Sequence, residues 1–213
     1  ASNRKFSIRT FDPYDYMIRE WTPSQTHNIS LSGKSGKTTF NVGLGYLAQN
    51  GLMKVAKHDD FRRWNGSIRL STEINKYITA RAGANYSKRN KRYAYATNST
   101  TADPWLYLYR WDSTYPMGYD ENGNEMRSPV SEVHQANTAN KEDNYLSFNV
   151  GATLKITKDW KFDIDYTYAG EDQIWKKNGT KYTAADTWTA PVKRLDGNGN
   201  QIYVNNKGEV VSA

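Results

Sequence analysis

The sequence of 213 residues predicts an all-β fold, an antiparallel meander of about six strands. Two observations support this prediction. Apolar and polar residues alternate strictly in several segments, which is typical of half-buried strands and not of helices. Short connectors built from Gly, Asn, Asp and Lys alternate with long connectors. In a meander, this alternation places every tight turn at one end of the sheet and every long loop at the other.

Each predicted strand has one apolar side and one polar side. The strands cover residues 27–32, 38–48, 63–74, 78–87, 146–156 and 160–168. The tight connectors read GKSGK, NKY and TKDW, and the long connectors cover 49–62 and 88–145. In the second strand, Phe40 and Val42 alternate with Asn41 and Gly43. The apolar residues of the strands carry even numbers from Phe40 to Tyr168, which predicts one apolar face.

The aromatic residues of this apolar face indicate a membrane. If successive strands reverse direction, most of them lie near the long-loop end: Tyr46, Trp64, Tyr86, Phe148, Tyr166 and Tyr168. Trp160 lies near the tight-turn end. Aromatic girdles of this kind occur where barrels cross the lipid headgroups, and strands of about 9 to 12 residues are long enough to cross at a tilt. The sequence therefore predicts part of a large transmembrane β-barrel with long extracellular loops.

Six strands are too few for such a barrel. They cannot close around a water-filled lumen, and unpaired strand edges are costly in lipid. We therefore expect a segment of a larger barrel. The alternative is a soluble or cell-surface β-sandwich that binds carbohydrate, in which the apolar face is core.

Composition excludes several other classes. The net charge is +7 and the pI about 9.3, but Lys and Arg are scattered among acidic residues, so no nucleic-acid partner is expected. Without cysteine, no disulfide or thiol nucleophile is available. No apolar run approaches the ~18 residues of a membrane-spanning helix, and residues 1–20 lack the apolar stretch of a signal peptide.

Three stretches suggest a family. SQTHNISLSGKSGKTTFNVGLGYLAQNGLMK is followed by DDFRRWNGSIRLSTEINKYI, and QANTANKEDNYLSFNVGATLKITKDWKFDIDYTY comes later. Together, over about residues 23–168, they resemble the SusC/RagA family of TonB-dependent outer-membrane transporters of Bacteroidetes. The resemblance implies a barrel of about 22 strands, a plug domain, contact with TonB and a SusD-like lipoprotein over the outer mouth.

The resemblance also implies a function and a location. It implies import of oligosaccharides or peptides across the outer membrane of a Gram-negative bacterium, with lipid around the barrel. The sequence contains no recognisable plug, TonB-contact segment or terminal strand, so residues 1–213 are expected to be an internal segment of the barrel domain.

Two groups of residues are candidates for functional contacts. The charged residues of the polar face would line the lumen: Arg63, Arg69, Glu73, Arg81, Asp163 and Asp165. In the longest connector, four aromatic residues occupy every second position: Trp105, Tyr107, Tyr109 and Trp111. On an extended segment they would share one face, where they could contact either substrate or the lid lipoprotein.

No catalytic residue, metal site or cofactor is expected. The carboxylates of Asp163 and Asp165 stand two residues apart, a separation that could suit a glycosidase pair, but solvated lumen charges are the favoured interpretation. The segments DENGN and DGNGN lack the Gly and Glu positions of a calcium loop, so they predict hairpin turns. The histidines show no metal-ligand spacing.

Overall fold

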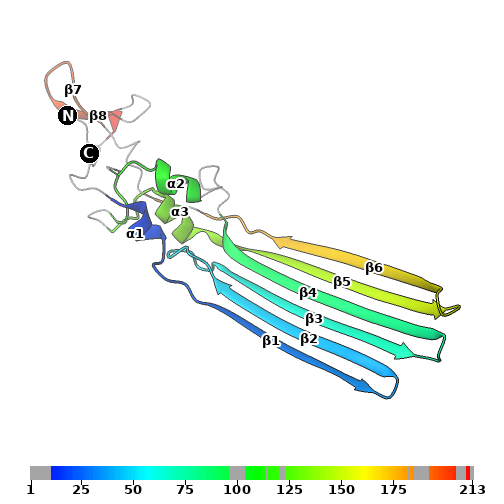
Figure 1. Ribbon diagram of the computed structural model, residues 1–213. Helices are drawn as coiled ribbons and strands as arrows, with labels where there is room; N and C mark the ends of the chain where they lie inside the picture. The colour runs from blue at the N-terminus through cyan, green and yellow to red at the C-terminus, as the bar shows by residue number, and fades with distance from the viewer. Residues whose placement is uncertain are drawn as a thin grey trace.

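The protein is described from a computed structural model that covers residues 11–95, 104–113, 115–119, 123–181, 183–184, 192–204 and 210–211. Its main feature is one six-stranded antiparallel sheet whose strands are neighbours in chain order (Figure 1). The strands are β1 (Ser24–Ser35), β2 (Thr38–Asn50), β3 (Asp60–Glu73), β4 (Ile78–Tyr95), β5 (Asn137–Lys155) and β6 (Lys161–Lys176). The predicted meander of six strands is confirmed, and the sheet is open.

The tight turns form where the connectors predict them. Gly36 joins β1 to β2 with a φ of 58°, a conformation that glycine adopts without steric cost. Between β3 and β4, the Asn75 side chain accepts hydrogen bonds from the backbone N–H groups of Tyr77 and Ile78, at 2.8 and 2.9 Å. Between β5 and β6, the Thr157 hydroxyl accepts the N–H of Trp160 at 3.1 Å. A glycine thus permits the first turn, and local side-chain acceptors close the other two.

Strands β4 and β5 are longer than predicted. β4 continues to Tyr95 and β5 begins at Asn137, and the two strands pair without interruption as far as Tyr95 and Asn137. The connector between them is therefore 96–136 and not 88–145. The alternation of apolar and polar residues ends near Ser87 and Leu146, but the backbone ladder does not need it.

Three short helices at the long-loop end were not predicted. They are α1 (Pro13–Met17), α2 (Pro104–Arg110) and α3 (Pro129–Gln135) (Figure 1). α1 begins at Asp12, whose side chain accepts the N–H of Tyr14 at 2.9 Å. α3 begins at Ser128, which forms a capping box with Ser131. Among the described residues, no helix is long and apolar enough to cross a membrane.

The buried core lies among these helices and not on the sheet. We call this region the cap; it comprises residues 11–23, 51–59 and the described residues of 104–136. Its core side chains are Phe11, Met17, Met53, Ala56, Leu108, Met117, Val130 and Val133. Three segments far apart in the sequence therefore pack together at one end of the sheet.

A second, small sheet follows β6. It consists of β7 (Val192–Leu195), β8 (Gln201–Val204) and β9 (Val210–Val211) in that order. The turn between β7 and β8 is the segment Asp196–Asn200, so this predicted hairpin is confirmed. The DENGN segment is flanked by a bridge between Tyr119 and Glu125, although residues 120–122 lie outside the described part.

The apolar face of the six-stranded sheet is uncovered. Directly paired residues of antiparallel strands share a face, and the register joins Leu31, Val42, Ile68, Ala84, Phe148 and Tyr168 in one row across all six strands. Leu31 is 62% exposed and Tyr168 is 61% exposed. Within the described residues, α3 contacts β4 at the cap end, where Ala94 packs on the cap core, and no second sheet or helix covers the rest of this face. The second layer that a β-sandwich needs is not found there.

Candidate functional site

The opposite, polar face collects all six charged residues that the sequence assigns to a lumen. The register pairs Arg69 with Gly83 and Arg81 with Gly151, and it carries the same face on to Asp165 of β6. Arg63, Glu73 and Asp163 have the same parity on their strands. The structure thus brings these residues onto one face, while the lumen itself remains a proposal.

Three of these residues form one ion network. Arg81 lies 3.0 Å from the Asp165 carboxylate and 3.4 Å from the Asp163 carboxylate. The Thr153 hydroxyl hydrogen-bonds to both Arg81 and Asp163. One guanidinium therefore holds the two carboxylates that stand two residues apart. Because both carboxylates pair with Arg81, the arrangement favours charge pairing on the polar face over the glycosidase pair considered from the sequence.

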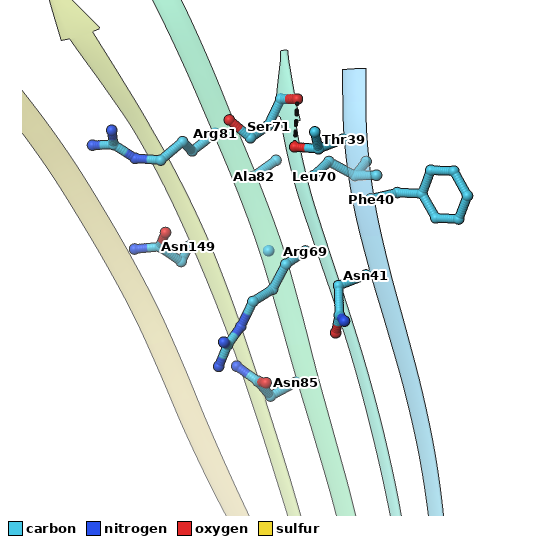
Figure 2. A pocket seen from close by; sticks show the side chains of 11 residues that line it. Thr39, Phe40, Asn41, Arg69, Leu70, Ser71, Arg81, Ala82, Asn85 and Asn149 are labelled. Carbon is cyan, nitrogen blue, oxygen red and sulfur yellow. Dashed lines mark hydrogen bonds between the residues drawn. The ribbon is translucent and has the colours of Figure 1, made fainter. Parts of the chain in front are cut away.

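Arg69 lines a hollow in the same face, of about 520 Å³, together with the carboxamides of Asn41, Asn85 and Asn149. This volume is within the range of small-ligand sites. Figure 2 shows Arg69 and Asn85 extending side by side, with Phe40 directed away from them. Within the described part of the chain, no carboxylate forms an ion pair with Arg69.

A second hollow lies closer to the cap on the same face. Its polar lining includes Asn28, Ser30, Asn65 and Ser67. A Cβ atom on the neighbouring Gly43 would stand 2.9 Å from the Ser67 hydroxyl, so glycine permits this close approach. Both hollows lie on the polar face, as expected if this face is the concave one.

The four aromatic residues of the longest connector do not share an extended face. Residues 104–110 form α2, and side chains two residues apart on a helix point in different directions, so the extended interpretation is wrong. Trp105 and Tyr109 stand four apart, on one side of α2, and are 47% and 73% exposed. Trp111 follows the helix and packs against the cap core. The side chain of Tyr107 lies outside the described part.

The extension of β4, β5 and β6 places further residues on the polar face that the sequence interpretation missed. They are Arg89, Lys91, Lys141 and Trp175. The odd numbers of these residues could have placed them on the polar face. They were missed because the alternation of apolar and polar residues stops before the strands end.

No metal site is found among the described residues, where no group of three or more His, Asp or Glu side chains converges. In the DGNGN turn, Asp196 accepts the backbone N–H groups of Asn198 and Asn200, both at 2.8 Å. Its oxygens therefore serve the turn. Hydrogen bonds from the backbone N–H of Asn200 and then from its side chain are the largest causes that hold the pKa of Asp196 below its usual value.

No protein-family model and no curated protein matches the sequence. The functional argument therefore depends on the geometry of the sheet.

Proposed function

We propose that this chain forms part of the barrel wall of an outer-membrane, TonB-dependent transporter. It would import oligosaccharides or peptides together with a SusD-like lipoprotein, as the resemblance to the SusC/RagA family suggests. The observation that supports a membrane barrel is the shape of the uncovered apolar face: its upper boundary from β3 to β6 and its lower boundary from β2 to β6 cross the strands on a slant.

The upper boundary is marked by the last aromatic or apolar residue before polar side chains begin on this face. On β3 it falls between Trp64 and Arg62, and on β4 between Tyr86 and Lys88. The register pairs Trp64 with Lys88, so on β4 the boundary lies two residues closer to the tight turns than on β3. On β6 the boundary follows Tyr168, which is two residues closer again.

This displacement gives a tilt angle. The total displacement of four residues corresponds to about 13.6 Å along the strands, and the three interstrand steps from β3 to β6 correspond to about 14.4 Å across them. The boundary therefore lies about 43° from the perpendicular to the strands. This angle equals the strand tilt that would make the boundary level, and strands in membrane barrels tilt by about 35–45°. A slanted boundary on the sheet becomes a level one when the strands are tilted in a membrane.

The lower boundary slants in the same direction. It follows Phe40 on β2, before Thr38, and it reaches Trp160 immediately before β6. Phe40 belongs to the row of Tyr166, six residues from Trp160 along the chain. On β6 the apolar face runs from Trp160 to Tyr168, about 27 Å along the strand and about 20 Å along a membrane normal at this tilt, near the height of the apolar band of such barrels.

Lipid is the environment that such a band fits. The band is too exposed for a folded core and too regular for scattered surface residues. Because β1 and β6 have free outer edges in the six-stranded sheet, further strands must pair with them within a bilayer. The proposal therefore includes a larger barrel, in which the polar face lines the water-filled interior and the cap stands at the outer mouth.

Spin labels on single-cysteine variants of the full-length protein, reconstituted in lipid vesicles, test the proposal. Labels at Leu44, Ile68 and Phe148 are expected to respond to a relaxation agent dissolved in the lipid. Labels at Asn41, Arg69 and Asn149 are expected to respond to one dissolved in water. Water exposure at both sets of positions would exclude the barrel and favour a soluble β-sandwich.

A further inference from the structure

Four cations meet on the polar face at its outer end. Arg63 of β3 stands directly opposite Arg89 of β4. In the next row of the same face, two residues along β4, Lys91 stands opposite Lys141 of β5. Like charges directly opposite each other on neighbouring strands destabilise a sheet. Two such pairs side by side therefore need a compensating reason.

The nearby acidic residues offset only part of this positive charge. Asp143 stands opposite Arg89, and its carboxylate also accepts a hydrogen bond from the Gln173 amide at 2.7 Å. Glu171 lies one row further toward the tight turns. Among the described residues, none of the four cations forms an ion pair, whereas Arg81, Lys88 and Arg92 all do.

Aromatic rings border the same cations. From β3 to β6, the row that contains Lys91 and Lys141 runs from Phe61 to Trp175, so this part of it reads aromatic, lysine, lysine, aromatic. Trp175 is 47% exposed, and the ammonium group of Lys177 lies 3.3 Å from the centre of its ring. The row spans about 14 Å across three interstrand steps, a length that a short oligosaccharide can cover.

We propose that this row and the adjacent row of Arg63 and Arg89 together bind an acidic oligosaccharide whose carboxylates are held by Arg63, Arg89, Lys91 and Lys141. The inference rests on the proposed function, because only the inner face of a transporter barrel would present the row to a passing substrate. Carboxylates bind Lys and Arg through charge-assisted hydrogen bonds, and sugar rings pack on aromatic side chains. The hydroxyl groups of the sugar find amide and hydroxyl partners at Asn65 and Ser87, in the row next to Arg63 and Arg89.

An acidic sugar fits this surface better than an acidic peptide does. A peptide in extended form binds sheets at free edges through its backbone. The row crosses the interior strands β3, β4 and β5, whose backbone groups are used on both sides by the ladder. Only side chains are available here: cations, amides, hydroxyls and rings, with the carboxylate of Asp143 opposite Arg89.

Binding of tri-galacturonate to the full-length protein in detergent, measured by calorimetry, tests this inference. The double variant K91Q/K141Q is expected to weaken binding about tenfold or more, because two charge-assisted hydrogen bonds are lost. The wild-type affinity is expected to fall as salt is added. Neutral maltotriose is expected to bind much more weakly than the acidic trimer.

The matched control is K155Q/K161Q, which removes the other directly opposed lysine pair, at the tight-turn end of the same face. It is expected to change the affinity by less than twofold. Equal weakening by both double variants would overturn the inference, and so would equal binding of maltotriose or of a tri-glutamate peptide. If tri-galacturonate does not bind while the spin labels report lipid on the apolar face, the inference fails and the proposed function stands. If the labels report water on both faces, the proposed function fails.

Discussion

The cap and the sheet bury apolar side chains in opposite ways. In the cap, Met17 is fully buried and Val133 is 3% exposed, although the helices that carry them have only five and seven residues. In the sheet, Ile29 is 72% exposed and Leu44 is 61% exposed, on strands of 12 and 13 residues. The short helices thus surround the core, and the long strands leave their apolar side chains uncovered.

This difference shows that secondary structure does not require burial of apolar side chains here. The ladder satisfies the backbone N–H and C=O groups of the sheet, so the sheet can form while its apolar face has no partner within the described residues. The cap helices are too short to be stable alone, so they depend on contacts among distant segments. We expect the cap to respond to substitution as a soluble protein does and the sheet to respond as a membrane protein does.

The largest expected effect is in the cap. Met17→Ala leaves a cavity in a fully buried site and is expected to destabilise the cap by about 2–5 kcal/mol. Hydrogen exchange checks this at Lys54, whose backbone N–H donates to the Met17 carbonyl at 2.6 Å. Leu31→Ala, at an exposed position of the sheet, serves as the control. Equal acceleration of exchange by the control would contradict the distinction between the two regions.

A somewhat smaller effect is expected from a charge on the apolar face. Val42→Arg would place a cation in the middle of the proposed lipid band, at a cost of about 2–4 kcal/mol. Asn149→Arg places the same charge on the polar face, opposite Gly83 and Thr167, and little change is expected there. Urea titration of folding into lipid vesicles measures both variants. Equal costs would mean that the two faces have the same surroundings.

The smallest expected effect is in the β7–β8 hairpin, which depends on neither the cap core nor lipid. Because hydrogen bonds from Asn200 lower the pKa of Asp196, the ionised carboxylate stabilises the folded turn. This stability is complete above the unfolded-state pKa and is lost as the pH falls through the lower pKa of the folded state.

Amide chemical shifts of the hairpin during an acid titration check this prediction. Asp196→Asn is the control and should remove the pH dependence. A transition that persists in this variant would assign the effect to another group.

Part of the site followed from the sequence because a strand's faces depend only on parity. Once Phe40 and Asn41 are placed on opposite sides, the face of Arg69, Arg81 and Asp165 follows from their numbers and from short turns of known length. The aromatic helix was missed for the opposite reason. A seven-residue helix carries too little periodicity to be distinguished from an extended segment, and α2 is stabilised by the cap core through Leu108.

By itself, the sequence determined the strand order, the tight turns and the division into an apolar and a polar face, because these depend on residues that are neighbours in the chain. Only the tertiary structure decided how far β4 and β5 extend, that Arg81 joins Asp163 and Asp165, and that the cations of β3, β4 and β5 meet in adjacent rows. These features depend on the pairing register between strands, which brings together residues that are distant along the chain.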